Sequence, residues 1–181
     1  HAHPELAFNE KRTAEKVADY LEGLGLEVHR GIARTGVVAK LSCGGGGGAI
    51  GLRADMDALP LKELNTFPHH STHDGRMHAC GHDGHTAMLL GAAEALSRLR
   101  DFDGTVYFIF QPAEEHEGGG RVMVEEGLFE RFPMDMVFGL HNWPGLPAGS
   151  IGVTEGPVMA GTDRFEIEIT GHGGHAAMPH Q

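Results

Sequence analysis

The pattern of apolar and polar positions indicates helices in three stretches of the chain, one by its spacing and two by their composition and end signals. Over residues 6–24 the apolar side chains recur at close to helical intervals with charged residues between them, and glycines mark the end of the stretch. Residues 84–100 combine strong helix formers with a basic last turn, and residues 120–126 stop before a glycine. The pattern therefore predicts one helix over each of these stretches.

Five further stretches are short and rich in apolar residues, as strands are: residues 26–29, 36–41, 49–53, 105–110 and 136–140. The run TVYFIF at 105–110 is almost uninterrupted, which is typical of a strand buried on both faces, and we expect MVFGL at 136–140 to be buried as well. Because strands and helices alternate along the chain, we predict the α/β class, with a mixed, mostly parallel sheet covered by helices.

The character of the chain changes near Gly156 and Pro157. Residues 165–170, FEIEIT, alternate apolar and charged positions, which predicts a strand with one face in water. We therefore expect a first domain over residues 1–156 and the beginning of a second over residues 157–181, too short to enclose a core of its own. The sequence is expected to be a fragment of a longer protein.

The composition of the chain limits which partners and which cellular compartment we expect for it. Lys and Arg number 14 and Asp and Glu number 25, so the formal net charge is −11, which argues against a nucleic acid or an anionic membrane as partner. No apolar run approaches the roughly 20 residues of a membrane-spanning helix, and residues 1–10 lack the pattern of a secretion signal, so we expect a cytoplasmic protein. The two cysteines, Cys43 and Cys80, can form at most one disulfide bond.

Histidine is the unusual component, since the chain has 14 and several lie close to Cys, Asp and Glu. The segment HACGHDGH at residues 78–85 holds three histidines and a cysteine. Cys80 and His82 can both turn toward one ion, because glycines flank them and because thiolate and imidazole are ligands of zinc-like metals. A single histidine is more often an ordinary core or surface residue, but this density favours a metal site.

Two neighbouring carboxylates, Glu114 and Glu115, follow the apolar stretch 105–110. Sites in α/β proteins collect where apolar strands end, so we expect both carboxylates at a crevice. One of them could bind a metal while its neighbour accepts a proton from water. His141 follows the stretch 136–140 and should lie at the same edge, so the sequence predicts a site with several ligands.

A fourth segment, GHGGHAAMPH at residues 171–180, belongs to the expected second domain. Its glycines let the backbone approach another group closely, and His175 could polarise a substrate carbonyl or bind a carboxylate. Spacing alone does not favour this role over a structural turn.

Together these segments closely resemble those of the metal-dependent amidohydrolases of the hippurate hydrolase and auxin-conjugate hydrolase type. The resemblance follows the family's order over essentially the whole chain and rests on HAHPE (1–5), GLRADMDALP (51–60), HACGHD (78–83), QPAEE (111–115), GLHN (139–142) and GGHAAMPH (173–180). It implies that residues 1–156 belong to a catalytic α/β domain. It also implies that residues 157–181 begin a smaller α+β lid domain, which forms the contact of a homodimer.

The resemblance further implies a role for each candidate residue. Two divalent metal ions would be held by Cys80 as a bridge and by His82, Glu115 and His141. Zn, Mn, Co and Ni all fit these ligand types. Glu114 would be the general base, and His175 from the partner subunit's lid would stabilise the oxyanion. Asp55 and Asp83 would orient the ligands, and a peptide bond next to Cys80 would be cis.

The implied reaction is hydrolysis of the amide bond of a small N-acyl amino acid by a water molecule that two metals activate. A dipeptidase of the same superfamily and a catalytically silent metal-binding fragment are the alternatives. Family members are longer and place their last metal-binding histidine beyond this chain, and His116 and Glu117 stand where they usually have glycines. We therefore expect this chain by itself to bind metal incompletely and to lack useful activity.

Overall fold

The computed structural model describes residues 1–161, 163, 165–178 and 180. The chain divides into two compact units, residues 1–143 and 144–181, and each is described by itself. Among the described residues, no helix is both long enough and apolar enough to span a membrane.

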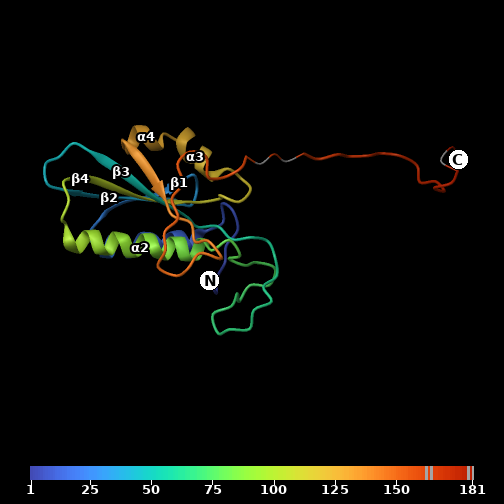
Figure 1. Ribbon diagram of the computed structural model, residues 1–181, viewed down its shortest axis with the longest axis horizontal. Helices are drawn as coiled ribbons and strands as arrows, with labels where there is room; N and C mark the ends of the chain where they lie inside the picture. Colours follow the sequence, from blue (N-terminus) through green and yellow to red (C-terminus); the bar gives the residue numbers. More distant parts are fainter. Residues whose placement is uncertain (162, 164, 179, 181) are drawn as a thin grey trace. The chain divides into compact units, whose positions relative to one another are not determined.

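The first unit is built on a five-stranded sheet with the order β1-β2-β4-β3-β5 (Figure 1). Its strands are β1 (Glu27–Ile32), β2 (Gly36–Cys43), β3 (Ala49–Asp55), β4 (Gly104–Gln111) and β5 (Met136–Gly139). Strand β2 is antiparallel to both β1 and β4, whereas β3 is parallel to β4 and to β5. Four of the five strands therefore point the same way, which confirms the predicted mixed, mostly parallel sheet.

Helices cover both faces of the sheet. They are α1 (Lys11–Gly23), α2 (His82–Leu99), α3 (Gly119–Glu125) and α4 (Leu128–Arg131). Figure 1 shows α2 on one side of the sheet and α3 and α4 on the other. Phe108 and Phe110 of β4 pack into the core beneath α1 and α2, while Tyr107 and Ile109 pack into a second core with α3 and α4. Since β4 contributes to both cores, its sequence is apolar at almost every position, as predicted.

Two helix starts differ from the expectation. Helix α1 begins at Lys11 instead of residue 6, because the carboxylate of Glu5 accepts hydrogen bonds from the backbone N–H groups of Arg12 and Thr13 at 3.0 and 2.8 Å. A carboxylate that caps these free N–H groups fixes where the helix can start. Helix α2 begins at His82, two residues earlier than expected, so this histidine lies in the first helical turn and not in a loop.

Strand β5 was expected to be buried, and this was wrong. Each of its four residues is exposed, with Phe138 at 51%. The strand lies at the edge of the sheet, where it pairs only with β3, and no described element of the first unit pairs with its outer edge. An apolar run therefore predicts a strand but not its burial, because an edge strand has a neighbour on one side only.

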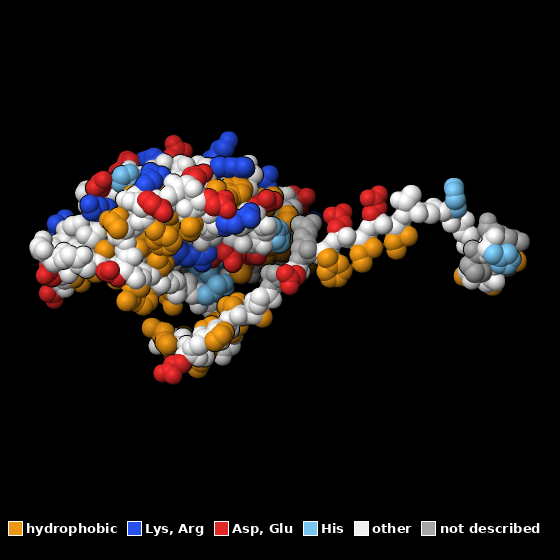
Figure 2. Space-filling view, turned by 90° about the horizontal axis from the view of Figure 1, so that it is seen from above, with side chains coloured by type: hydrophobic (Ala, Val, Ile, Leu, Met, Phe, Trp, Pro, Cys, Tyr) orange, Lys and Arg blue, Asp and Glu red, His pale blue; other side chains and the backbone are white. Residues whose placement is uncertain are grey.

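The second unit is extended over residues 165–170, where a strand was expected, and the described residues show none there. A strand needs a neighbour, and the described part of this unit offers only a bridge between His175 and Met178. Acidic and apolar side chains still lie on opposite sides of the extended segment (Figure 2), as the alternation predicted. The domain boundary after residue 156 stays a prediction.

Candidate metal centre

Six expected site residues reach one edge of the sheet in the first unit. Strands β3, β4 and β5 are parallel, so their carboxyl ends lie together, at Asp55, Gln111 and Gly139. Glu114 and Glu115 follow β4 within four residues, and the segment after β5 supplies a histidine. The start of α2 brings the cysteine and histidine of the CGH segment to the same edge. The predicted convergence of these segments is therefore present.

The potential metal-binding atoms form three overlapping groups, and within each group the atoms lie within 4.8 Å of one another. The groups are Cys80, His82 and His141; His82, Glu114 and Glu115; and Asp55, His82 and His85. His82 belongs to all three and is only 1% exposed. It is therefore the centre of the candidate site.

Two atoms at this centre are buried without any hydrogen-bond partner, namely His82 Nε2 and Glu115 Oε1. They lie 3.7 Å apart, which is too far for a hydrogen bond. An unpartnered buried polar atom costs about 1–3 kcal/mol, so such atoms usually have a function that the protein atoms alone do not reveal. Two bonds of about 2 Å to a shared ion reach across this separation, so the donor set fits a divalent metal.

Gly81 allows its two neighbours, Cys80 and His82, to face the same site. Its backbone has φ +87°, in the left-handed region that favours glycine. A Cβ atom there would also collide with the side chain of Asn142, whose amide nitrogen lies 3.3 Å from the Gly81 carbonyl oxygen. Both the backbone conformation and the nearby Asn142 side chain therefore favour glycine between Cys80 and His82. The Sγ atom of Cys80 lies 3.5 Å from Nε2 of His141.

Asp57 positions two of the expected ligands, although no role was expected for it from the sequence. Its Oδ1 lies 3.2 Å from Nδ1 of His82, and its Oδ2 accepts a 3.0 Å hydrogen bond from the backbone N–H of Glu115. The His82 ring is therefore held with Nε2 toward the site. These bonds to the carboxylate outweigh burial and lower the pKa of Asp57. The available signal was the pair of aspartates, two positions apart, in RADMD at the end of β3.

The contacts of Asp57 lead to a prediction about metal affinity. Asp57→Asn in the whole protein should weaken divalent-metal binding by about 10- to 100-fold without unfolding it, because the group that orients His82 loses its charge. Asp135→Asn is a matched control, since the Asp135 carboxylate accepts a backbone N–H from Ala49 at the other end of β3. Equal metal affinities of the two variants, measured by competition with a chelator, would contradict the role of Asp57.

Asp55 and His85 tie the segment after β5 to helix α2. Asp55 Oδ1 accepts a 2.6 Å hydrogen bond from Nδ1 of His85, and Nε2 of His85 accepts a 3.0 Å hydrogen bond from the backbone N–H of Asn142. Arg53 donates a 2.7 Å hydrogen bond to the other oxygen of Asp55. The neighbouring His141 is in this way held at the site although β5 is exposed.

The remaining candidates lie elsewhere. The carboxylate of Asp83 faces His1, at 2.8 Å from its Nδ1, so an orienting role for Asp83 stays a prediction. His175 belongs to the second unit, where its Nδ1 accepts a 3.2 Å hydrogen bond from the backbone N–H of Ala177. The described peptide bonds are all trans, so the expected cis bond next to Cys80 was wrong. Trans geometry is the ordinary state of a bond that does not precede proline.

The electrostatics of the centre favour cations. The pKa of the Cys80 thiol is raised to about 12, chiefly by burial. The charge of Glu115, a hydrogen bond with Glu115, and the charges of Glu114 and Asp55 raise it further. Burial alone would lower the pKa of His82, but the hydrogen bond to Asp57 and the surrounding carboxylates raise it. Both side chains therefore hold their protons more firmly than usual when no cation is bound.

Metal binding should consequently become tighter as the pH rises. A metal binds the thiolate and the neutral imidazole, so binding must release the protons that Cys80 and His82 hold. We expect the apparent affinity to increase by about tenfold per pH unit for each proton released. Calorimetric titrations in buffers of different ionisation enthalpy count these protons. An affinity that does not change between about pH 6 and 8 would contradict this assignment of the ligands.

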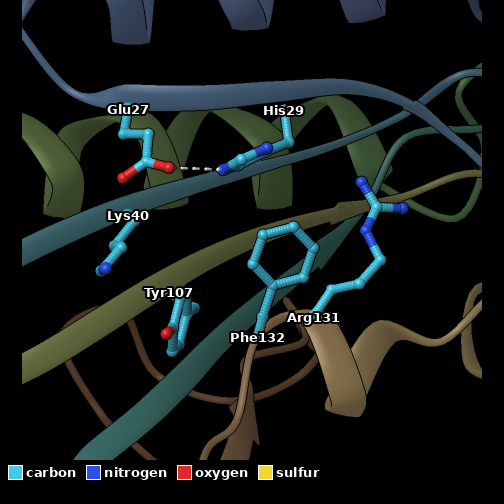
Figure 3. Close-up of a pocket in the computed structure, with 6 residues that line it drawn as sticks. All are labelled: Glu27, His29, Lys40, Tyr107, Arg131 and Phe132. Atoms are coloured by element: carbon cyan, nitrogen blue, oxygen red, sulfur yellow. Dashed lines mark hydrogen bonds and ion pairs between the residues drawn. The ribbon is translucent and has the colours of Figure 1, made fainter.

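The first unit also has a cavity of about 310 Å³ on the face of the sheet that carries α4 (Figure 3). Its lining consists of Glu27, His29, Lys40, Tyr107, Arg131 and Phe132. Figure 3 shows the Phe132 ring between the basic side chains, with Glu27 paired to His29. None of the expected site residues lines this cavity, so the candidate centre is defined by its donor atoms and not by this cavity.

Comparison with known proteins bears on the nature of this centre. The chain is 51% identical over 184 residues to an N-acyl-L-amino acid amidohydrolase of Geobacillus stearothermophilus, covering 100% of this chain and 49% of that protein. It is 48% identical over 179 residues to a hippurate hydrolase of Campylobacter jejuni, covering 99% of this chain and 46% of the relative. The chain thus spans about half the length of these relatives.

A solved structure and a family pattern agree with these relatives. A dinuclear metal-binding M20-family peptidase of Bacillus subtilis superposes with a TM-score of 0.82 and 46% sequence identity, over 87% of this chain and 44% of that one. Residues 51–181 match the pattern of Peptidase family M20/M25/M40. The resemblance found in the sequence is therefore confirmed, and the chain belongs to peptidase family M20/M25/M40.

Proposed function

We propose that the whole protein to which this chain belongs hydrolyses the amide bond of small N-acyl amino acids with divalent metal ions as cofactors. The observation that carries the proposal is the pair of buried, unpartnered atoms, His82 Nε2 and Glu115 Oε1, within a cluster of thiol, imidazole and carboxylate groups. The relatives named as an N-acyl-L-amino acid amidohydrolase and a hippurate hydrolase support the substrate class.

Four side chains would hold two ions, with Cys80 as the bridge and His82, Glu115 and His141 as further ligands. Zn, Mn, Co and Ni all accept this mixture of sulfur, nitrogen and oxygen ligands. When bound, they supply Lewis-acid chemistry, which polarises the scissile carbonyl and makes a water molecule more acidic. Asp57 holds His82 and the backbone of Glu115 in place for this task.

Glu114 would be the general base that moves the proton. Its side chain is 42% exposed, and its Oε2 lies 3.9 Å from Nε2 of His82, so it borders both solvent and the donor cluster. As general base, Glu114 takes a proton from the attacking water, whose oxygen bonds to the carbonyl carbon. The carbon–nitrogen bond then breaks, and Glu114 gives the proton to the leaving nitrogen. The products are a carboxylic acid and a free amino acid.

We also assign a role to residues 157–181, which lie within the second unit. Residues 157–181 would begin a lid domain that also joins two subunits, and His175 would stabilise the developing oxyanion from the partner subunit's lid. Residues 1–156 would then form part of the catalytic domain. The dimer is open to direct measurement, by sedimentation of the whole protein with and without the lid.

The substrate class is tested by assaying the whole protein against a panel. N-acetyl, N-benzoyl and indole-acetyl amino acids would be compared with dipeptides, each with Zn, Mn, Co or Ni, by measuring the released amine. We expect metal-dependent hydrolysis of N-acyl amino acids that a chelator abolishes and added metal restores. Preferential cleavage of dipeptides would favour a dipeptidase, and no cleavage with any metal would contradict the proposal.

A further inference from the structure

The carboxylate of Glu10 is fully buried and has no part in the metal centre or in a helix cap. It directly precedes α1, but Glu5 accepts the first N–H groups of that helix in its place. Glu10 is thereby free to turn inward. A buried carboxylate is costly unless every oxygen is hydrogen-bonded, so its partners indicate its purpose.

Those partners join three separate parts of the first unit. Glu10 Oε1 accepts hydrogen bonds from the backbone N–H of Phe8 at 3.0 Å and from that of Ala113 at 2.9 Å. Its Oε2 accepts a 2.5 Å hydrogen bond from the hydroxyl of Thr35, in the turn between β1 and β2. The contact with Ala113 links positions 103 residues apart in the sequence.

Ala113 is the residue immediately before the two glutamates of the site, and its backbone is unusual. It has φ +52°, a left-handed conformation that alanine seldom adopts. Its carbonyl oxygen accepts a 2.9 Å hydrogen bond from the N–H of Gly119, while its own N–H goes to Glu10. Such a conformation persists only where the surroundings determine it, and it sets the direction in which the next residues leave β4.

We propose that Glu10 is a positioning residue, which holds Ala113 in its left-handed conformation and so places Glu114 and Glu115 at the metal centre. The geometry divides this work between two buried carboxylates. Glu10 fixes the chain before the glutamate pair through the Ala113 N–H, and Asp57 fixes it after Glu114 through the Glu115 N–H. The catalytic consequence of this role rests on the function proposed above.

Shape and charge of Glu10 can be separated by two substitutions in the whole protein. Glu10→Gln keeps the length and one oxygen for the N–H groups of Phe8 and Ala113, and its amide can donate to the Thr35 hydroxyl, so turnover should stay within about threefold. Glu10→Asp keeps the charge but is one methylene too short to reach Ala113 and Thr35 together. We expect kcat to fall roughly 10- to 100-fold with little change in KM.

Glu5→Asp is the matched control, because Glu5 is a hydrogen-bonded carboxylate at the same helix that does not contact Ala113. It should lower stability while leaving kcat of the folded enzyme near its original value. An Ala113→Gly background adds a second criterion, since glycine adopts the left-handed region freely. The loss caused by Glu10→Asp should be smaller in that background.

Amide hydrogen exchange gives a readout that does not depend on substrate. The N–H groups of Ala113 and Glu115 should exchange faster in Glu10→Asp than in Glu5→Asp. If Glu10→Asp does not fold, Thr35→Val removes one anchor of the Glu10 carboxylate and should shift exchange and kcat in the same directions.

If the unsubstituted protein cleaves no amide, the proposed function fails and exchange alone decides the role of Glu10. Unchanged exchange, unchanged kcat in folded Glu10→Asp, or an equal loss in both backgrounds would overturn it.

Discussion

Replacing Glu114 by glutamine in the whole protein should lower turnover by about 10²- to 10⁴-fold while the bound metal is retained. The range is that of a general base, because the amide keeps the shape of the side chain but cannot accept a proton at neutral pH. The side chain borders the donor cluster, with its Oε2 3.9 Å from Nε2 of His82, but it is still partly exposed to solvent. Turnover and metal content would be measured on the same preparation.

Glu117→Gln provides the control for this experiment. Glu117 follows in the same loop and is exposed, but it belongs to none of the groups that could hold a metal among the described residues. Its substitution should leave kcat unchanged. Near-normal turnover of Glu114→Gln would remove Glu114 from the mechanism, and a parallel loss of metal would show that Glu114 is a ligand instead of the base.

Cys80→Ala should lose metal and activity together. If the sulfur bridges two ions, its removal deprives both of a ligand, so affinity should fall by more than the roughly 100-fold that an orienting group such as Asp57 can account for. Cys43→Ala is the matched control, because the thiol of Cys43 instead contacts the backbone carbonyl of Arg100, at 3.0 Å. It should retain both metal and turnover.

The result for Cys80 is read from the metal content of the folded variant. A Cys80→Ala protein that binds two ions as tightly as the Cys43→Ala control would show that the sulfur is a packing residue. The high pKa of the thiol, about 12, agrees with a side chain that loses its proton only when a cation replaces it.

Local patterns were sufficient to predict most of the fold. Strand β4 is apolar at consecutive positions because Phe108 and Tyr107 face different cores, and this is visible in the sequence before any partner is known. Helix α2 followed from its composition, and the site edge followed from where the apolar stretches ended. These features depend on neighbours in the chain, so the sequence alone carries them.

Features that depend on distant partners could not be predicted in the same way. The exposure of β5 depends on its place at the edge of the sheet, and its apolar residues do not indicate that place. The start of α1 depends on the carboxylate of Glu5, which lies before the helix. Helix α4 is too short to show a periodic pattern in the sequence.

The same distinction between local and distant features applies to the candidate site. Its ligand types were visible as clusters, because Cys80 and His82, and likewise Glu114 and Glu115, are close in sequence. Asp57, which positions two of them, was not, since it lies 25 residues from His82 in the chain. Such a pairing is set by the tertiary fold, and a single aspartate or glutamate in one sequence does not reveal it.

Binding of divalent metal by four side chains of this chain underlies every catalytic role proposed above. The most direct test is a crystal structure of the zinc-loaded whole protein with anomalous differences recorded at the zinc edge. We predict peaks within about 2.0–2.3 Å of Cys80 Sγ, His82 Nε2, Glu115 and His141, with the sulfur shared between two ions. Zinc found only at other histidines, or a centre without anomalous density at full zinc loading, would contradict it.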